Sequence, residues 1–266
     1  MKPRTPSSSS TGKEWLSNFH PNDQEGAALL IDSLNIVSTD AVNLNLRQAL
    51  MIWAKQHTER LPAQLLPVLS IEDIDRHLSD EAEKAGRMYH PPDSGHVAWT
   101  TYEPGATILS TPGSEGAIGN LIRNFTGDDP KALDPDPNWL HPNSDLARLR
   151  SAQCRTIVIL CDYAGSGRQA TRFAETIRRN PTIKSWYSMK RIRLEVLAFA
   201  ASPAARAAME DSPFIDATMV LNPGRRFDEA PWSPDQREEI ERICTTYVTQ
   251  HLSDYALGYK GSAGLY

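Results

Sequence analysis

A short segment in the middle of the chain combines an acidic residue with a glycine-rich turn. Asp162 stands at the end of the apolar run Ile157–Leu160, and Gly165-Ser166-Gly167 follows it closely. The glycines allow a tight turn, and Ser166 can cap the next helix, whose free N–H groups and dipole then face an anion. We therefore expect a phosphate at this loop. Asp162 is placed to accept hydrogen bonds from sugar hydroxyls or from waters on a divalent metal.

Chemistry at this loop requires a strand before it and a helix after it. A fully apolar run suits a central parallel strand that is buried on both faces, and α/β sheets bind ligands beyond the carboxyl ends of such strands. After Gly95, short β-rich runs alternate with helical ones, as in βαβ units. The expected strands are Val97–Tyr102, Thr107–Ser110, Thr156–Cys161, Leu194–Phe199 and Ala217–Leu221, and the expected helices are Ala117–Phe125, Asp145–Ser151, Gln169–Arg179, Pro203–Glu210 and Pro234–Ser253.

The pattern predicts an α/β fold, with a mostly parallel sheet of about five strands flanked by helices. Before Gly95 the periodicity is helical, and strands are hard to place there. We expect a disordered tail over residues 1–13, a helical N-terminal region over 14–95 and an α/β core over 96–266.

Composition narrows the class of protein. The 266 residues carry 28 Lys and Arg against 33 Asp and Glu, a net charge of −5, which argues against a globally cationic nucleic-acid binder. Three cysteines without CxxC spacing do not build a disulfide scaffold or a cysteine-rich zinc site. No run approaches the roughly 20 apolar residues of a membrane helix, so we expect no membrane partner and a cytoplasmic location.

Positive charge is concentrated in one segment, Arg168–Arg193. The segment contains eight basic residues and one acidic residue, Glu175, and Trp186 and Tyr187 lie among them. A solvated helix face has this composition, and so does a surface for a protein or nucleic-acid partner.

The pattern around Asp162 partly matches the ligand-binding loops of two families, the dinucleotide-binding proteins and the amino-methyltransferases. Gly165-x-Gly167-x-x-Ala170 matches a loose dinucleotide fingerprint, but no acidic residue ends a strand about 20 residues later. Glu195 is further away and begins its strand. The segment from Asp162 to Gly167 also looks like the AdoMet-binding loop of amino-methyltransferases, whose second motif, Asn/Asp-Pro-Pro-aromatic, is missing.

The loop most resembles the PRPP loop of type I phosphoribosyltransferases, in which an acidic pair is followed three residues later by Ser/Thr-Gly. Cys161-Asp162 takes the place of the acidic pair, and Ser166-Gly167 that of Ser/Thr-Gly. More narrowly, the chain resembles the phosphoribosyltransferase-like PRTase-CE family of bacterial conflict systems, on the segment from Asp162 to Gln169. The resemblance extends to Trp15-Leu16-x-x-Phe19, Pro112–Gly116 and Leu257-Gly258-Tyr259.

The resemblance implies a type I phosphoribosyltransferase-like fold and a set of site residues. Asp162 would be the catalytic residue, acting through ribose contacts or through water on a metal, with Mg²⁺ bound together with PRPP. The residues expected to bind the substrate, PRPP or a nucleotide, are Cys161, Tyr163, Ala164, Gly165, Ser166, Gly167, Arg168 and Gln169. A second loop, after the first core strand, would bind the pyrophosphate through Pro112, Gly113, Ser114 and Gly116.

Two departures from the family pattern bear on activity. Cys161, a mostly neutral thiol, replaces the first acid of the pair, and the second loop contains neither Lys nor Arg. Two hypotheses remain open: an enzyme of the pentosyl-transfer type, or a catalytically inactive module of the same fold that senses a nucleotide and binds a partner. In both, the chain would be an effector or accessory protein of a bacterial antiphage system. An AdoMet-dependent methyltransferase is a third hypothesis.

Overall fold

The chain folds into two compact units, one of which is built from both ends of the sequence. The computed structural model describes residues 5–69, 79, 82–88, 114–126, 138–141, 144–249 and 256–257. One unit comprises residues 38–222, and the other comprises residues 1–37 together with 223–266. This division differs from the expected boundary near residue 95, because residues 38–69 supply a helix and a strand to the α/β unit.

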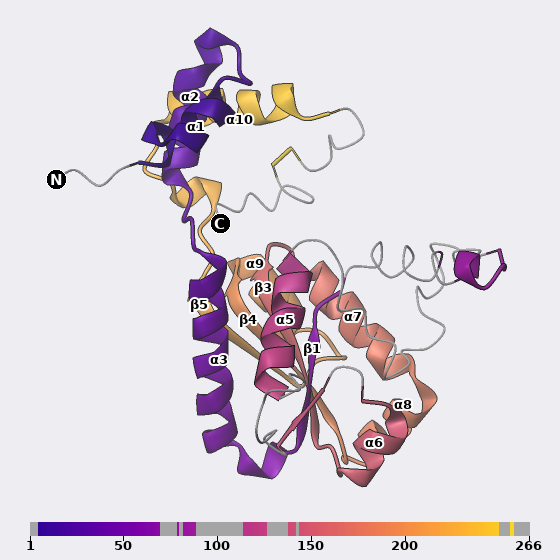
Figure 1. Cartoon of the computed structure of the whole chain (residues 1–266). Coiled ribbons are helices and arrows are strands. Elements are labelled where there is room, and N and C mark those ends of the chain that lie inside the picture. The colour runs from indigo at the N-terminus through magenta and orange to yellow at the C-terminus, as the bar shows by residue number, and fades with distance from the viewer. Residues whose placement is uncertain are drawn as a thin grey trace. The chain divides into compact units, whose positions relative to one another are not determined.

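A five-stranded sheet in the order β2-β1-β3-β4-β5 forms the centre of the larger unit (Figure 1). The strands are β1 (Ala63–Pro67), β2 (Trp139–Leu140), β3 (Thr156–Ala164), β4 (Arg193–Ala201) and β5 (Ala217–Pro223). Strand β1 pairs in parallel with β2 and β3, and β3 pairs in parallel with β4. Hydrogen bonds from Asp216 N to Leu194 O and from Asn222 Nδ2 to Phe199 O show that β5 also runs in this direction. The expected α/β fold is confirmed.

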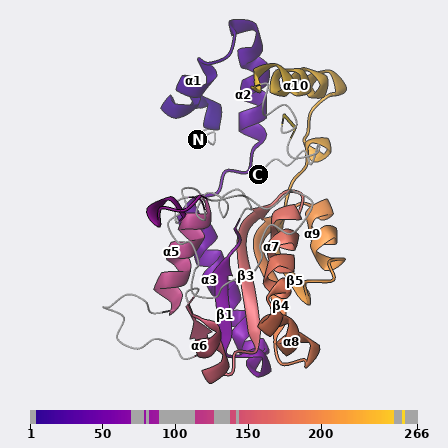
Figure 2. The same ribbon diagram turned by 90° about the vertical axis from the view of Figure 1, so that its right-hand side faces the viewer.

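Helices cover both faces of this sheet. They are α3 (Thr39–Gln56), η3 (Thr58–Arg60), α5 (Ser114–Thr126), α6 (Leu146–Ser151), α7 (Arg168–Arg179), α8 (Pro181–Ser188) and α9 (Pro203–Glu210). Figure 2 shows α3 and α5 on one side of the strands and α7, α8 and α9 on the other. Alternate residues of the central strands pack under each layer, so Ile157, Ile159 and Cys161 share one core cluster with Phe173 of α7 and Ile183 of α8.

Strand β1 lies where the sequence indicated only helices. Its five residues are all buried, and it occupies the position next to β3. Pro62 directly precedes the strand and Pro67 is its last residue, positions at which a missing N–H is tolerated. The three expected strands after residue 150 are present, each extended by one to three residues at one or both ends. The expected strands Val97–Tyr102 and Thr107–Ser110 lie outside the described residues.

The smaller unit is helical. It contains η1 (Pro6–Ser8), α1 (Ser10–Leu16), η2 (Pro21–Asp23), α2 (Gln24–Ser33), η4 (Phe227–Glu229) and α10 (Pro234–Tyr247). Phe227, Trp232 and Ile240 form its apolar cluster, against which Leu30 of α2 packs. From Thr5 onward the structure differs from the tail expected over residues 1–13, since Ser7 donates from both its N and its Oγ to the carboxylate of Asp32.

No helix in the described ranges has the length and apolar character needed to cross a membrane.

Candidate functional site

The glycine-rich loop joins the central strand of the sheet to α7. Strand β3 continues to Ala164, so Asp162 and Tyr163 lie within the strand near its end, and the loop itself is short. Gly165 and Ser166 follow, and Gly167 stands at the N-cap of α7 with a left-handed φ of 71°. The helix therefore starts at the carboxyl edge of the sheet with its first N–H groups directed at that edge, as an anion site requires.

Gly167 is required at its position by two independent constraints. The left-handed backbone disfavours any residue with a side chain. In addition, a Cβ atom at this position would lie 2.7 Å from the carbonyl oxygen of Ala205, closer than a real Cβ atom approaches backbone. The first turn of α9 thus packs directly against the loop.

Ser202 fastens the same loop to the end of β4. Its Oγ donates to Gly165 O at 2.6 Å, its N donates to Ala164 O at 3.0 Å, and its Oγ accepts from Ala205 N as the N-cap of α9. The residue is only 1% exposed. Ser202 was not among the residues predicted from the sequence: Ser before Pro203 is a recognisable helix start, but nothing in the sequence places it beside Gly165.

Asp162 and Cys161 point to opposite faces of the sheet. Cys161 is 3% exposed and belongs to the core cluster under α7 and α8, so its thiol packs in the interior. The half-buried Asp162 lies on the other face, and its Oδ1 accepts a hydrogen bond of 2.7 Å from Tyr163 N. A carboxylate has further acceptor sites on both oxygens, so Asp162 can also receive hydroxyl or water donors.

The described residues do not build a metal site around Asp162. No group of three or more His, Cys, Asp or Glu side chains that could hold a metal ion occurs among them. Asp162 is the single carboxylate of the loop, and Cys161 is buried on the other face.

The second glycine-rich segment is described only in part. Pro112 and Gly113 lie outside the described residues, while Ser114 and Gly116 fall in the first turn of α5. Strand β1 (Ala63–Pro67) pairs with β3, and the expected strand Thr107–Ser110 before this segment lies outside the described residues. Between β1 and α5 the chain is described at only a few positions.

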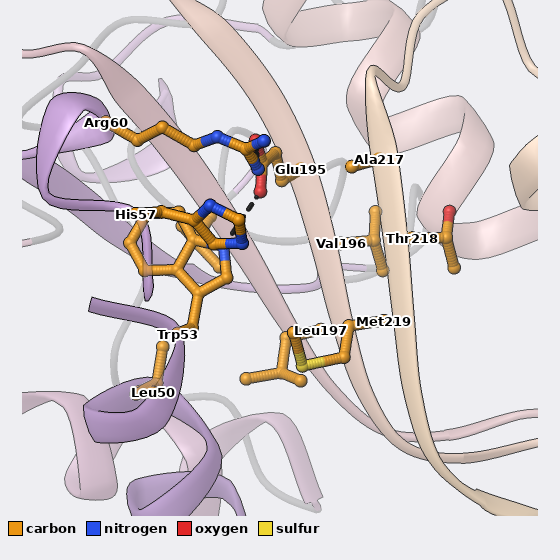
Figure 3. A pocket seen from close by; sticks show the side chains of 11 residues that line it. Leu50, Trp53, His57, Arg60, Glu195, Val196, Leu197, Ala217, Thr218 and Met219 are labelled. Atoms are coloured by element: carbon orange, nitrogen blue, oxygen red, sulfur yellow. Dashed lines mark hydrogen bonds and ion pairs between the residues drawn. The ribbon is translucent and has the colours of Figure 1, made fainter. Parts of the chain in front are cut away.

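A buried ion pair lies on the α3 side of the sheet, at the amino-terminal ends of the strands. The Glu195 carboxylate accepts hydrogen bonds from Trp53 Nε1 at 3.0 Å, Arg60 Nη1 at 3.0 Å and Arg193 Nε at 3.1 Å. Figure 3 shows Trp53, His57 and Arg60 around this carboxylate, beside a cavity of about 110 Å³. Glu195 lies at the opposite end of β4 from the glycine-rich loop, and its carboxylate is hydrogen-bonded to these three partners. It is therefore not the equivalent of a ribose-binding acid.

The basic segment Arg168–Arg193 divides into structural and exposed residues. Arg178 stacks on the ring of Tyr187, Arg179 pairs with Glu175, and Arg193 pairs with Glu195. Arg168 is half-buried beside the loop. Lys184, Lys190 and Arg191 are exposed near the amino-terminal end of β4. The segment is therefore no single continuous surface.

Comparison with known proteins identifies one family. A model of the PRTase-CE family matches residues 13–266, which is nearly the whole chain. No curated protein and no solved structure gives a significant match.

Proposed function

Because the chain belongs to the PRTase-CE family and has its phosphoribosyltransferase-like fold, we propose that it binds PRPP or the 5′-phosphate of a nucleotide through the segment Asp162–Gln169. The observation that carries the proposal is the left-handed N-cap Gly167, held against α9 at a position where a Cβ atom would also meet the carbonyl oxygen of Ala205. That conformation lets the backbone of the loop approach an anion without an intervening side chain.

Each part of the loop has its own role in this binding. The N–H groups in the first turn of α7 are directed at the carboxyl edge of the sheet, where they suit the oxygens of a 5′-phosphate, and the Arg168 N–H also donates to Ser166 Oγ at 3.4 Å. Arg168 adds positive charge beside them. Asp162 precedes the turn, near the carboxyl end of β3, and accepts hydrogen bonds from the ribose hydroxyls.

Mg²⁺ would bind together with the ligand. Mg²⁺ keeps several waters and binds mainly to substrate phosphates, so the diphosphate of PRPP would supply its ligands. Asp162 would reach the ion through water. We expect PRPP binding to be stronger with Mg²⁺ than without it.

Binding without rapid pentosyl transfer is the form of the proposal that the geometry favours. Within the described segment Cys161–Gln169 one carboxylate, Asp162, would face the ribose, because the neighbouring Cys161 is in the core on the other side of the sheet. The positive charge that develops at the anomeric carbon during transfer is stabilised by nearby negative groups. A single carboxylate supplies less of that stabilisation than a pair would.

The biological setting follows from the family resemblance. We assign the chain the role of an effector or accessory protein in a bacterial antiphage system, in which a partner responds to its ligand-bound state. Phage plating on cells that carry the intact system or its Gly167→Ala variant measures this role. Equal plating in both strains would contradict it.

Isothermal titration calorimetry with PRPP, in the presence and absence of Mg²⁺, tests the binding. We expect Asp162→Asn to weaken PRPP binding by about 10-fold, the value of one or two hydrogen bonds to a charged acceptor. Asp211→Asn is the matched control, since Asp211 is exposed after α9 and should have no effect. PRPP binding that is absent, or equal in all three proteins, would overturn the proposal. A pyrophosphate-release assay on the same proteins measures turnover.

A further inference from the structure

A hollow lined by arginines lies at the opposite end of the sheet from the loop. Its volume is about 320 Å³, and its lining comes from α6, α8 and the segments that lead into β3 and β4, namely Leu149, Arg150, Gln153, Cys154, Arg155, Trp186 and Arg191. Figures 1 and 2 both show α6 and α8 at the same end of the strands. From Thr156 to Ala164 the strand rises by roughly 26 Å, so this hollow is separate from the loop.

The charge of the hollow is positive, because three of its lining residues are arginines. Arg150, Arg155 and Arg191 are exposed at its rim, and no carboxylate in the described part of the chain forms an ion pair with any of them. Burial raises the pKa of the Cys154 thiol to about 12, so that lining residue is neutral. Three guanidinium groups around one hollow repel one another, and a bound anion would relieve this repulsion.

One wall of the hollow is aromatic. The guanidinium of Arg150 stands over the ring of Trp186, 5.7 Å from its centroid. Trp186 is half-buried against the core cluster, so its ring is held in place, and Leu149 adds an apolar surface beside it. Indole and guanidinium planes are the surfaces on which nucleobases stack.

The backbone that frames the hollow is also unusual. Gln153 and Lys190 have φ values of 57° and 54°, in the left-handed region, although neither is glycine. Each follows the helix that precedes a central strand, α6 before β3 and α8 before β4. Such conformations are unfavourable for residues with a side chain. The two matched turns bring Arg155 and Arg191 to the same hollow.

We infer that this hollow is a second ligand site, which binds a nucleoside phosphate. Arg155 and Arg191 bind the phosphates, because a guanidinium donates two parallel hydrogen bonds to phosphate oxygens. The base lies against Trp186 and Arg150. The volume lies within the range of small-molecule sites and exceeds what a phosphate alone needs. The same chemistry is offered by a free nucleotide and by the phosphorylated end of a nucleic-acid strand.

Calorimetry with ATP tests the site on the full chain. We expect the double variant Arg155→Gln/Arg191→Gln to bind ATP at least 10-fold more weakly than the wild type. Arg148→Gln is the matched control, because Arg148 is exposed on the same helix α6 and does not line the hollow. Since the replaced side chains are exposed, the melting temperature should be unchanged in both variants.

Asp162→Asn separates this site from the proposed loop site. ATP binding that survives Asp162→Asn and is lost in the double arginine variant supports the hollow, whether or not PRPP binds to the loop. ATP binding that is lost in Asp162→Asn and kept in the double arginine variant overturns the hollow and supports the loop. Binding that is absent, or unaffected by either change, also overturns the hollow.

Two further ligands define what is recognised. Inorganic triphosphate should bind at least 10-fold more weakly than ATP, since it cannot stack on Trp186; equal affinity would overturn the assignment to a nucleoside phosphate. A single-stranded oligothymidylate with a 5′-phosphate distinguishes the sources. Tighter, arginine-dependent binding than that of ATP supports a strand end, and weaker binding supports a free nucleotide.

Discussion

The hydroxyl of Ser202 donates a hydrogen bond of 2.6 Å to the carbonyl oxygen of Gly165, so the end of β4 fixes the loop that follows β3. The two residues are 37 positions apart in the sequence. Because the same hydroxyl caps α9, the geometry of the loop depends on a neighbouring crossover.

Replacement of Ser202 by alanine should loosen the loop as well as destabilise the fold. The variant loses the cap of α9 and leaves Gly165 O without this donor, which together cost about 1–3 kcal/mol. Urea denaturation measures the loss, and calorimetry should show weaker PRPP binding. Ser38→Ala removes the cap of α3 without touching the hydrogen bond from Ser202 to the loop, and should leave PRPP affinity unchanged. Equal PRPP affinity in Ser202→Ala and wild type would refute the positioning role.

Gly167→Ala should be more damaging than an ordinary glycine replacement. At Gly167 the added Cβ atom is disfavoured by the left-handed backbone and also clashes with the carbonyl oxygen of Ala205. At Gly86 the φ of 64° is similar, but no atom lies within 4 Å of the added Cβ. Gly86→Ala therefore measures the conformational cost alone, about 1–2 kcal/mol. We expect Gly167→Ala to lose more stability than Gly86→Ala in denaturation experiments, and to lose PRPP binding. Equal losses in the two variants would show that the close approach to α9 is unimportant.

Removal of the Glu195 side chain should be strongly destabilising without affecting ligands of the loop. Glu195→Ala leaves Arg60 and the indole N–H of Trp53 without their acceptor in a site where Glu195 is only 4% exposed. Breaking a buried ion pair in this way costs about 3–5 kcal/mol. Glu210→Ala, which breaks an exposed pair with Arg206, should cost under about 1 kcal/mol. A cost for Glu195→Ala as small as that for Glu210→Ala would contradict the assignment of a buried pair.

The helical unit should weaken as the pH falls. The pKa of Asp23 is lowered by the hydrogen bond from the Tyr247 hydroxyl and by the neighbouring Arg242. A carboxyl whose pKa is lower in the folded state stabilises that state above its unfolded pKa of about 3.9, and the contribution is lost as the pH falls through the folded value. Acid titration followed by hydrogen exchange of α2 and α10 measures the effect.

Tyr247→Phe tests which bond is responsible for that dependence. The variant should flatten the acid dependence of the helical unit, because it removes the largest cause of the lowered pKa of Asp23. Tyr163→Phe, in the other unit, should leave the acid dependence of α2 and α10 as in the wild type. An unchanged titration in Tyr247→Phe would mean that Arg242 alone sets it.

Local patterns predicted the α/β class and the strand before the loop, because those features depend on residues close together in the sequence. The apolar run Ile157–Leu160 needs no knowledge of its neighbours to be read as a buried strand. Helix α9 was predicted with its observed bounds for the same reason, since Ser-Pro marks its start.

The features of the fold and site that the sequence did not predict depend on contacts between distant segments. Strand β1 is short and flanked by prolines, and only its pairing with β3 makes it a strand. The burial of Cys161 follows from the direction of its side chain relative to Asp162, which the spacing of the PRPP motif does not reveal. The roles of Ser202 and of the arginine-lined hollow arise where separate crossovers meet.

Both ends of the chain build the helical unit, and this affects the order of folding during synthesis. Asp23 pairs with Arg242 across 219 positions, and Trp232 donates to Ser33 across 199. On the ribosome, α2 is made well before its partner α10, so the sheet unit can fold in the interval between them. For most of that time the apolar side chains of α2 lack their native cover, and a chaperone that shields them should improve the yield of folded protein.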